Sequence, residues 1–171
     1  MRIYVAGPYA ARDHLQVLVT TGRIGEGHHP ITSRWLWGDH AITPGVVDAA
    51  PEQSDEYTKQ HVQEDLADID RADVVLLFTS GWCMENLGLR KDQTGSGGRH
   101  VETGYALAKK KLVIVVGSPE NIFHRGACVI VPGVEEALTV LSEMVCEECG
   151  DDLVAEGLSV CTECLARSEY S

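Results

Sequence analysis

The chain has 171 residues and a formal net charge of −12 at pH 7, with 44% hydrophobic and 23% charged residues. This length allows one domain with a sizeable core and a small appendage. An acidic protein is a poor match for the phosphate backbone of DNA or RNA, which binds clustered Lys and Arg. The sequence shows neither an apolar run of membrane-spanning length nor a secretory signal at its N-terminus. We therefore expect a cytoplasmic protein that acts on a small molecule.

The first elements predict a strand, a turn and a helix. Residues 2–6 form an apolar run typical of a buried strand, Gly7 and Pro8 end it, and residues 10–20 have helical character. A second strand is expected over residues 31–36. Residues 41–54 contain three helix-breaking residues and predict an irregular excursion of the kind that often forms a lid or binding loop.

The middle of the chain predicts a helix that leads into a central strand. Across residues 55–71, Val62, Leu66 and Ile69 recur at helical spacing and mark the buried face, with Asp65 beside it. Residues 73–78 then form an unbroken apolar run, which fits a parallel strand covered on both faces. Asp65 is therefore expected in surroundings that solvate its charge poorly.

A long polar loop over residues 79–98 precedes a short helix and a strand over residues 112–116. Gly97 and Gly98 are expected to let the backbone turn tightly and approach a ligand, and Glu102 is expected in the first turn of the helix. For an isolated Glu, a favourable interaction with the helix dipole would be sufficient explanation. Because Glu102 follows a glycine-rich loop, a functional role is favoured for it instead.

A short strand over residues 128–131 and a helix over residues 134–145 complete an alternation of strands and helices. This alternation predicts an α/β fold over residues 1–145, with a doubly wound, mostly parallel, five-stranded sheet of the flavodoxin or Rossmann-like kind. Ligands of such sheets bind outside the carboxyl ends of the strands. The loops expected there carry Gly7, Tyr9, Arg12, Ser96, Gly98, Arg99, Glu102, Asn121 and Phe123. Neither a phosphate-binding P-loop nor a dinucleotide-binding fingerprint occurs in them.

The C-terminal residues 146–171 carry two pairs of cysteines, CEEC and CTEC, separated by eleven residues. In a reducing compartment, this spacing predicts tetrahedral coordination of a structural zinc ion by Cys146, Cys149, Cys161 and Cys164. We therefore expect a small zinc ribbon. Residues 142–171 carry eight acidic residues against one basic residue, which argues against nucleic acid, so the ribbon either stabilises a short tail or recruits a partner.

Four segments taken in order resemble the nucleoside 2-deoxyribosyltransferases, whose relatives include N-glycosidases of nucleoside 5′-monophosphates. They are IYVAGPY, EDLADIDRADVVLLF, GGRHVETGYALAKKKLVIVV and ENIFH, and the resemblance covers residues 1–145 without the ribbon. The resemblance implies Glu102 as a nucleophile that attacks the anomeric carbon, with Asp65 assisting the base or the sugar hydroxyls. It also implies that Asn121 and Phe123 are lent to a neighbouring subunit, in a homodimer or higher oligomer with shared active sites.

One position bears on the substrate. Ser96 lies six residues before Glu102. In the family that the chain resembles, the transferases that act on free nucleosides have an aspartate at this position, and the monophosphate N-hydrolases have a serine. Arg12, Arg99 and Arg34 are candidates to bind the 5′-phosphate, because a guanidinium fork suits phosphate geometry. Each of these arginines would equally serve to neutralise acidic groups on a strongly acidic surface.

The sequence thus predicts cleavage of the N-glycosidic bond of a 2′-deoxynucleoside or its 5′-monophosphate through a covalent intermediate on Glu102. The sugar would pass either to water or to another base, and no metal or organic cofactor is needed for this chemistry. The alternative is a non-catalytic nucleotide-binding module whose zinc ribbon docks a partner.

Overall fold

A computed structural model describes residues 1–24, 30–38, 51–94 and 97–144, with the backbone alone over residues 51–58. Within these ranges, four strands form one parallel sheet in the order β1-β2-β3-β4. They are β1 (Ile3–Ala6), β2 (Val74–Phe78), β3 (Leu112–Val116) and β4 (Val129–Val131). The predicted α/β fold with a parallel sheet is confirmed.

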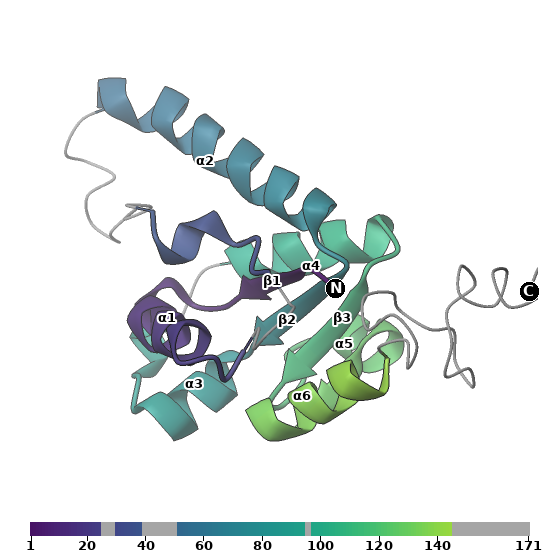
Figure 1. Ribbon diagram of the computed structural model, residues 1–171. Coiled ribbons are helices and arrows are strands. Elements are labelled where there is room, and N and C mark those ends of the chain that lie inside the picture. The colour runs from purple at the N-terminus through teal and green to yellow at the C-terminus, as the bar shows by residue number, and fades with distance from the viewer. Residues whose placement is uncertain (25–29, 39–50, 95–96, 145–171) are drawn as a thin grey trace, which may run out of the picture.

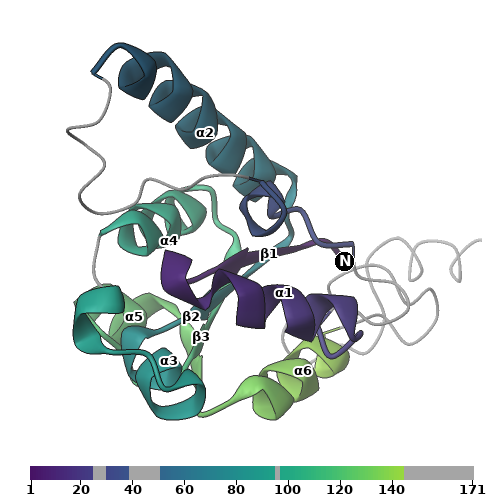
Figure 2. The ribbon, with the colours of Figure 1, turned by 90° about the vertical axis from the view of Figure 1, so that its left-hand side faces the viewer.

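Helices cover both faces of the sheet (Figure 1). Helices α1 (Arg12–Thr20) and α6 (Val134–Glu143) lie on one face, and α2 (Pro51–Arg71) and α4 (Gly98–Ala108) lie on the other, as the turned view in Figure 2 also shows. Helix α3 (Ser80–Leu87) follows β2, and α5 (Ile122–Ala127) follows β3. Short 3-10 helices occur at Tyr9–Ala11, Arg34–Leu36 and Lys91–Gln93. Among the described helices, none has both the length and the apolar character required to cross a membrane.

The sheet forms the centre of the hydrophobic core. Every residue of β1 and β2 is buried, and so are the last four residues of β3. Strands covered on both faces have no solvent side, so their sequences are apolar throughout rather than alternating. This is why the apolar runs were reliable predictors of the strands.

The sequence predicted five strands, and the one expected over residues 31–36 does not form. Ile31 makes a single parallel bridge to Ile3, and a 3-10 helix then begins at Arg34. Two side chains, and not the backbone of a neighbouring strand, form hydrogen bonds with Val5 at this edge of β1. Ser33 Oγ accepts the Val5 N–H at 2.5 Å, and the Trp35 indole N–H donates to the Val5 carbonyl at 2.7 Å. These bonds satisfy buried backbone groups that an added strand would otherwise pair.

Two other predictions need correction. The expected loop over residues 79–98 contains α3, whose N-terminus is capped by the Thr79 hydroxyl accepting the Trp82 N–H. On α2, Ile69 is buried and Leu66 is partly buried, but Val62 is 52% exposed. Burial falls toward the N-terminal end of α2 because that end extends beyond the sheet (Figure 1).

Candidate functional site

Glu102 and Tyr4 form the centre of the site. Tyr4 is fully buried in β1, and its hydroxyl donates to Glu102 Oε1 at 2.6 Å. Glu102 lies in the second turn of α4, which begins at Gly98, so the prediction of a first-turn position is wrong and the helix dipole contributes little there. Burial raises the pKa of Glu102 to about 6, although the Tyr4 hydrogen bond and the Arg99 charge both oppose that rise.

Asp65 supplies a second carboxylate from α2. Its pKa is raised to about 7, first by burial and then by the negative charges of Glu102, Asp68 and Glu64. Two carboxylates in one poorly solvated site lose their protons one after the other. Asp65 therefore holds its proton to a higher pH than Glu102 does. A pair of carboxyl groups with different pKa values is the kind of arrangement that acid–base and nucleophilic chemistry uses.

Tyr4 was missed by the sequence interpretation, which treated residues 2–6 as a buried strand. The available signal was a phenol among aliphatic side chains, since a buried Tyr hydroxyl needs a hydrogen-bond partner. Burial and the charges of Glu102 and Asp65 raise the Tyr4 pKa well above its ordinary value. Tyr4 therefore stays neutral and acts as a hydrogen-bond donor to Glu102.

Asp68, three residues after Asp65 on α2, has a different environment. It is completely buried, and its carboxylate accepts the Arg34 N–H at 2.8 Å and the Arg34 guanidinium at 2.9 Å. Arg71 donates to the same carboxylate. Asp68 thus fixes the segment before Trp35 against α2. Arg34, a phosphate candidate from the sequence, is engaged in this ion pair.

Arg99 is also engaged by the protein. Its side chain is 7% exposed, and its Nε and Nη2 each donate to one carboxylate oxygen of Glu120 at 2.9 Å. Nη2 also donates to Ser80 Oγ at 2.6 Å, and Nη1 donates to the Thr94 carbonyl at 2.9 Å. A phosphate would have to displace these buried acceptors to bind the guanidinium. The geometry therefore favours a role for Arg99 within the protein.

The remaining candidates from the first loop lie after β1. Gly7 packs so closely on α1 that a Cβ there would stand 2.9 Å from Leu15 Cδ1. Arg12 donates to the Tyr9 hydroxyl at 2.8 Å and to the Gly38 carbonyl at 3.1 Å, and Tyr9 is 37% exposed. Tyr9 and Arg12 thus form a polar group that begins directly beyond the end of β1.

Gly97 and Gly98, expected to allow a tight turn and a close approach to a ligand, lie at the start of α4. Gly97 has φ −77°, and Gly98 is helical, so neither uses the positive φ that only glycine adopts easily. A Cβ added at either position would meet nothing within 4 Å among the described residues. Ser96 lies outside the described residues.

Asn121 and Phe123 lie at the start of α5. Asn121 caps this helix, because its side-chain oxygen accepts the His124 N–H at 3.0 Å, and its amide nitrogen lies 3.3 Å from His100 Nδ1. Phe123 is 64% exposed. Asn121 thus has a structural role within its own chain, whereas Phe123 makes most of its surface available to another molecule.

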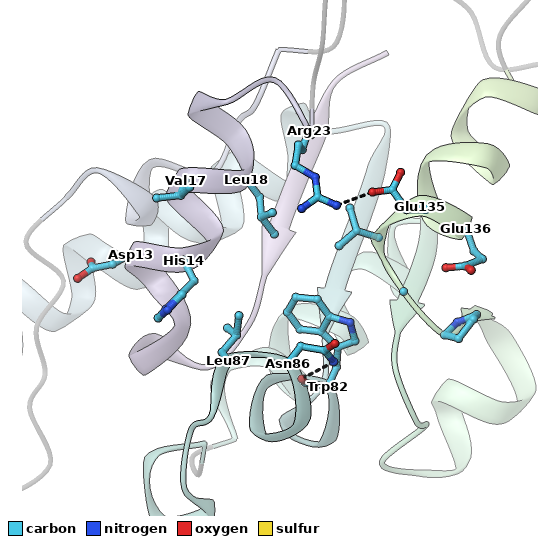
Figure 3. Close-up of a pocket in the computed structure, with 13 residues that line it drawn as sticks. Asp13, His14, Val17, Leu18, Arg23, Trp82, Asn86, Leu87, Glu135 and Glu136 are labelled. Atoms are coloured by element: carbon cyan, nitrogen blue, oxygen red, sulfur yellow. Dashed lines mark hydrogen bonds and ion pairs between the residues drawn. The ribbon is translucent and has the colours of Figure 1, made fainter.

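A cavity on the α1 and α6 face lies away from Glu102 and Asp65. It has a volume of about 600 Å³, and Figure 3 shows Leu18, Trp82 and Leu87 lining it together with the Arg23–Glu135 ion pair. None of the predicted site residues lines it. Volume alone does not make a reactive site, which also needs convergent groups with shifted pKa values. Glu102 and Asp65 are therefore the candidate site.

Thiol and metal chemistry receive no support from the described residues. Burial raises the pKa of Cys83 to about 12, so its thiol stays neutral and is a poor nucleophile. No cluster of His, Cys, Asp and Glu suited to a metal ion occurs in the described ranges. Cys146, Cys149, Cys161 and Cys164 lie outside them, so the zinc ribbon stays a prediction.

Two solved structures have a similar fold. A 2-deoxyribosyltransferase from the psychrotolerant bacterium Bacillus psychrosaccharolyticus matches with a TM-score of 0.50 and 17% identity over 80% of this chain and 90% of its own. A CMP N-glycosidase from Clostridium botulinum matches with a TM-score of 0.48 and 16% identity over 82% of this chain and 98% of its own. No protein-family model and no curated protein matches the sequence. At 17% identity, the likeness to the 2-deoxyribosyltransferase shows a shared α/β fold, and function must be argued from the site.

Proposed function

We propose that the chain is an enzyme that cleaves the N-glycosidic bond of a 2′-deoxynucleoside or its 5′-monophosphate, with Glu102 as the nucleophile. One observation carries the proposal: Glu102 and Asp65, from two different helices, both have raised pKa values beside the buried Tyr4 hydroxyl. Perturbed carboxylates that converge in this way are typical of active sites. The motif resemblance and the fold shared with a 2-deoxyribosyltransferase support the substrate class.

The first half of the reaction forms a bond between Glu102 and the sugar. The ionised carboxylate attacks C1′, the electron pair of the C1′–N bond leaves with the base, and the base takes the proton held by Asp65. Positive charge develops on the sugar, as in glycoside hydrolysis, and the negative charge of Glu102 stabilises it. The product of this step is a glycosyl ester of Glu102.

The second half releases the sugar. Water attacks C1′ and gives its proton to the Asp65 carboxylate, while the ester electrons return to Glu102. The Tyr4 hydroxyl, 2.6 Å from Glu102 Oε1, stabilises the carboxylate that is re-formed. If a second base attacks in place of water, the same intermediate gives a new nucleoside. The side chains present therefore suffice for either hydrolysis or transfer.

The proposed preference for a 5′-phosphate rests on Ser96 and on Arg12. Arg34 and Arg99 are paired with buried carboxylates, whereas Arg12 contacts the Tyr9 phenol, the Gly38 carbonyl and the exposed Asp13. Arg12 is therefore the better candidate to meet a phosphate. Replacement by Met should lower kcat/KM for the monophosphate about tenfold or more, the usual effect of losing a charge-assisted hydrogen bond, and should spare the nucleoside.

We also propose a homodimer in which α5 contributes to the neighbouring site. Ile122 and Phe123 of α5 are 76% and 64% exposed, and Val101 of α4 is 68% exposed. Exposed apolar groups that lie near one another are typical of interaction surfaces. Sedimentation should show a dimer, and Phe123→Asp should weaken it.

The zinc ribbon is proposed on the chemistry of four thiolates at paired spacing. Metal analysis should find about one zinc ion per chain, and Cys146→Ser combined with Cys161→Ser should lower that content. The same variant should keep base release if the ribbon is structural or docks a partner. Finding iron in anaerobically purified protein would contradict the assignment.

Incubation of the full chain with a panel of nucleosides and 5′-monophosphates, followed by chromatography, tests the central proposal. Release of free base from deoxy substrates is the expected result, and addition of a second base distinguishes transfer from hydrolysis. Rapid quenching and intact-mass measurement should detect one deoxyribosyl group, or its phosphate, on the enzyme. Ligand binding without base release would favour a non-catalytic nucleotide-binding module.

A further inference from the structure

We propose that Arg99 is a positioning residue that keeps the nucleophile Glu102 ionised, and that Glu120 holds Arg99 in place for this purpose. The proposal rests on the assignment of Glu102 as the nucleophile. It gives Arg99 a different role from the phosphate contact expected from the sequence, because the structure directs its guanidinium into the protein.

Arg99 and Glu102 lie three residues apart on α4. Residues at this spacing share one side of a helix, so the charge of Arg99 acts on Glu102 from its own helix. Arg99 is buried, and low solvation makes a charge interaction of this kind stronger than it would be at the surface. A guanidinium does not lose its proton in a protein, so this positive charge is permanent.

Glu120 fixes the position of that charge. It comes from the connection after β3 and accepts two hydrogen bonds from Arg99 in a fork-to-fork pair. It also accepts the Ser80 N–H at the start of α3 at 2.8 Å, while its own N–H donates to His124 Nδ1 at 3.2 Å. Arg99 therefore joins the starts of α3 and α4 to the loop after β3. Helix α3 follows the carboxyl end of β2, and the loop with Glu120 follows the carboxyl end of β3.

The backbone of this connection is itself closely fixed. Gly117 has φ +102°, and a Cβ there would stand 2.5 Å from Thr79 Oγ1 and 2.6 Å from Trp82 Cβ. Only glycine fits this approach, which brings the end of β3 against the start of α3. Glu120 follows three residues later and is thereby placed beside Ser80 and Arg99.

The charged groups around Glu102 show why a cation is needed. Tyr4 of β1 donates a hydrogen bond to it, and Asp65 and Asp68 of α2 add negative charge to the same region. Asp68 is neutralised by Arg34 and Arg71. Burial raises the Glu102 pKa to about 6, and the Tyr4 hydrogen bond and then the Arg99 charge oppose that rise. Loss of Arg99 would reduce the fraction of Glu102 that is ionised at acidic pH, and the attack on C1′ requires the carboxylate.

Two variants that break the same ion pair test this role. Arg99→Met removes the positive charge, so the acid limb of the kcat/KM profile should move to higher pH, with a loss of about threefold to tenfold at pH 5.5 relative to pH 8. Glu120→Gln leaves the positive charge without its counter-charge, so its acid limb should stay at or below the wild-type position. Arg99→Lys should restore the limb toward wild type. Simple loosening of the structure would move the limb of all three variants in the same direction.

A measurement without turnover separates this proposal from the proposed function. Carboxyl ¹³C NMR of the full chain, with the Glu102 signal assigned by Glu102→Gln, should show the Glu102 titration moving upward in Arg99→Met only. Absence of base release would overturn the proposed function and leave this result valid. Equal titration in wild type and Arg99→Met, or an upward shift in Glu120→Gln, would overturn the role of Arg99. If Arg99→Met does not fold, the Glu120→Gln shift decides the question alone.

Discussion

Two pairs of carboxylates in this protein are removed from solvent in different ways. Asp68 and Glu120 each accept hydrogen bonds from arginine side chains, Asp68 from Arg34 and Arg71 and Glu120 from Arg99. Asp65 and Glu102 instead lie near one another and near the Tyr4 phenol. Burial is common to both pairs, but the partner differs.

The partner determines the direction in which the pKa moves. Burial alone would raise the pKa of Glu120, but the hydrogen bonds from Arg99 and Ser80 bring it below its ordinary value. The pKa values of Asp65 and Glu102 rise to about 7 and about 6. A carboxylate held by an arginine is therefore committed to structure, whereas one that is poorly compensated can exchange a proton or attack an electrophile near neutral pH.

The largest effect is expected at the nucleophile. Glu102→Ala should reduce base release by about a thousandfold or more, because a variant without the carboxylate has no group to form the glycosyl ester. The fold should persist, as Glu102 is only partly buried and its removal leaves no large core cavity. Chromatographic assay with the unfolding midpoint as a control checks both points. Turnover near the wild-type rate would mean that Glu102 and Asp65 are not the reactive pair.

A smaller effect is expected from the Tyr4 phenol, which donates a hydrogen bond to Glu102. Tyr4→Phe keeps the buried ring and removes only the 2.6 Å hydrogen bond to Glu102, at a cost of about 1.5 to 3 kcal/mol in transition-state stabilisation. That cost corresponds to about a tenfold to just over a hundredfold loss in kcat/KM. The acid limb should also move to higher pH, because Tyr4 lowers the Glu102 pKa. An unchanged pH profile would show that the hydrogen bond does not reach the nucleophile.

The same substitution three residues apart on α2 gives the sharpest comparison. Asp68→Asn should destabilise the fold by about 1 to 3 kcal/mol, because it removes a buried charge that Arg34 and Arg71 require. Asp65→Asn should instead stabilise the fold at pH 8. Thermal unfolding of both variants and wild type at pH 5 and pH 8 checks this. Equal destabilisation by the two variants would contradict the distinction between the pairs.

The sign for Asp65 follows from linkage. Its folded pKa, about 7, lies above the unfolded value, so the stability that neutral Asp65 contributes is present at low pH and is lost as pH rises through about 7. Asn carries no charge at any pH. Asp65→Asn should therefore gain about 1 to 2 kcal/mol over wild type between pH 5 and pH 8, after allowance for solvent screening of a partly buried group. The gain should disappear at pH 4.

Much of the fold and both central carboxylates were predictable from local patterns. The apolar runs of β1, β2 and β3 identified a parallel sheet, because strands buried on both faces have no polar positions. Asp65 drew attention by its place beside the apolar side of α2, and Glu102 by its place in a short helix after two glycines. The expected fifth strand failed because Ser33 and Trp35 bond β1 through their side chains, which strand periodicity does not report.

The sequence by itself determined which segments are apolar, where helices alternate with strands, and which residue types are available for chemistry. Tertiary structure alone decided their partners. Tyr4 and Glu102 are 98 residues apart, and Arg99 and Glu120 are 21 apart, so no local pattern links them. An arginine looks the same in sequence whether it will bind a phosphate or a buried carboxylate. The choice depends on which acceptors the fold brings within hydrogen-bonding distance and on how much water it leaves between them.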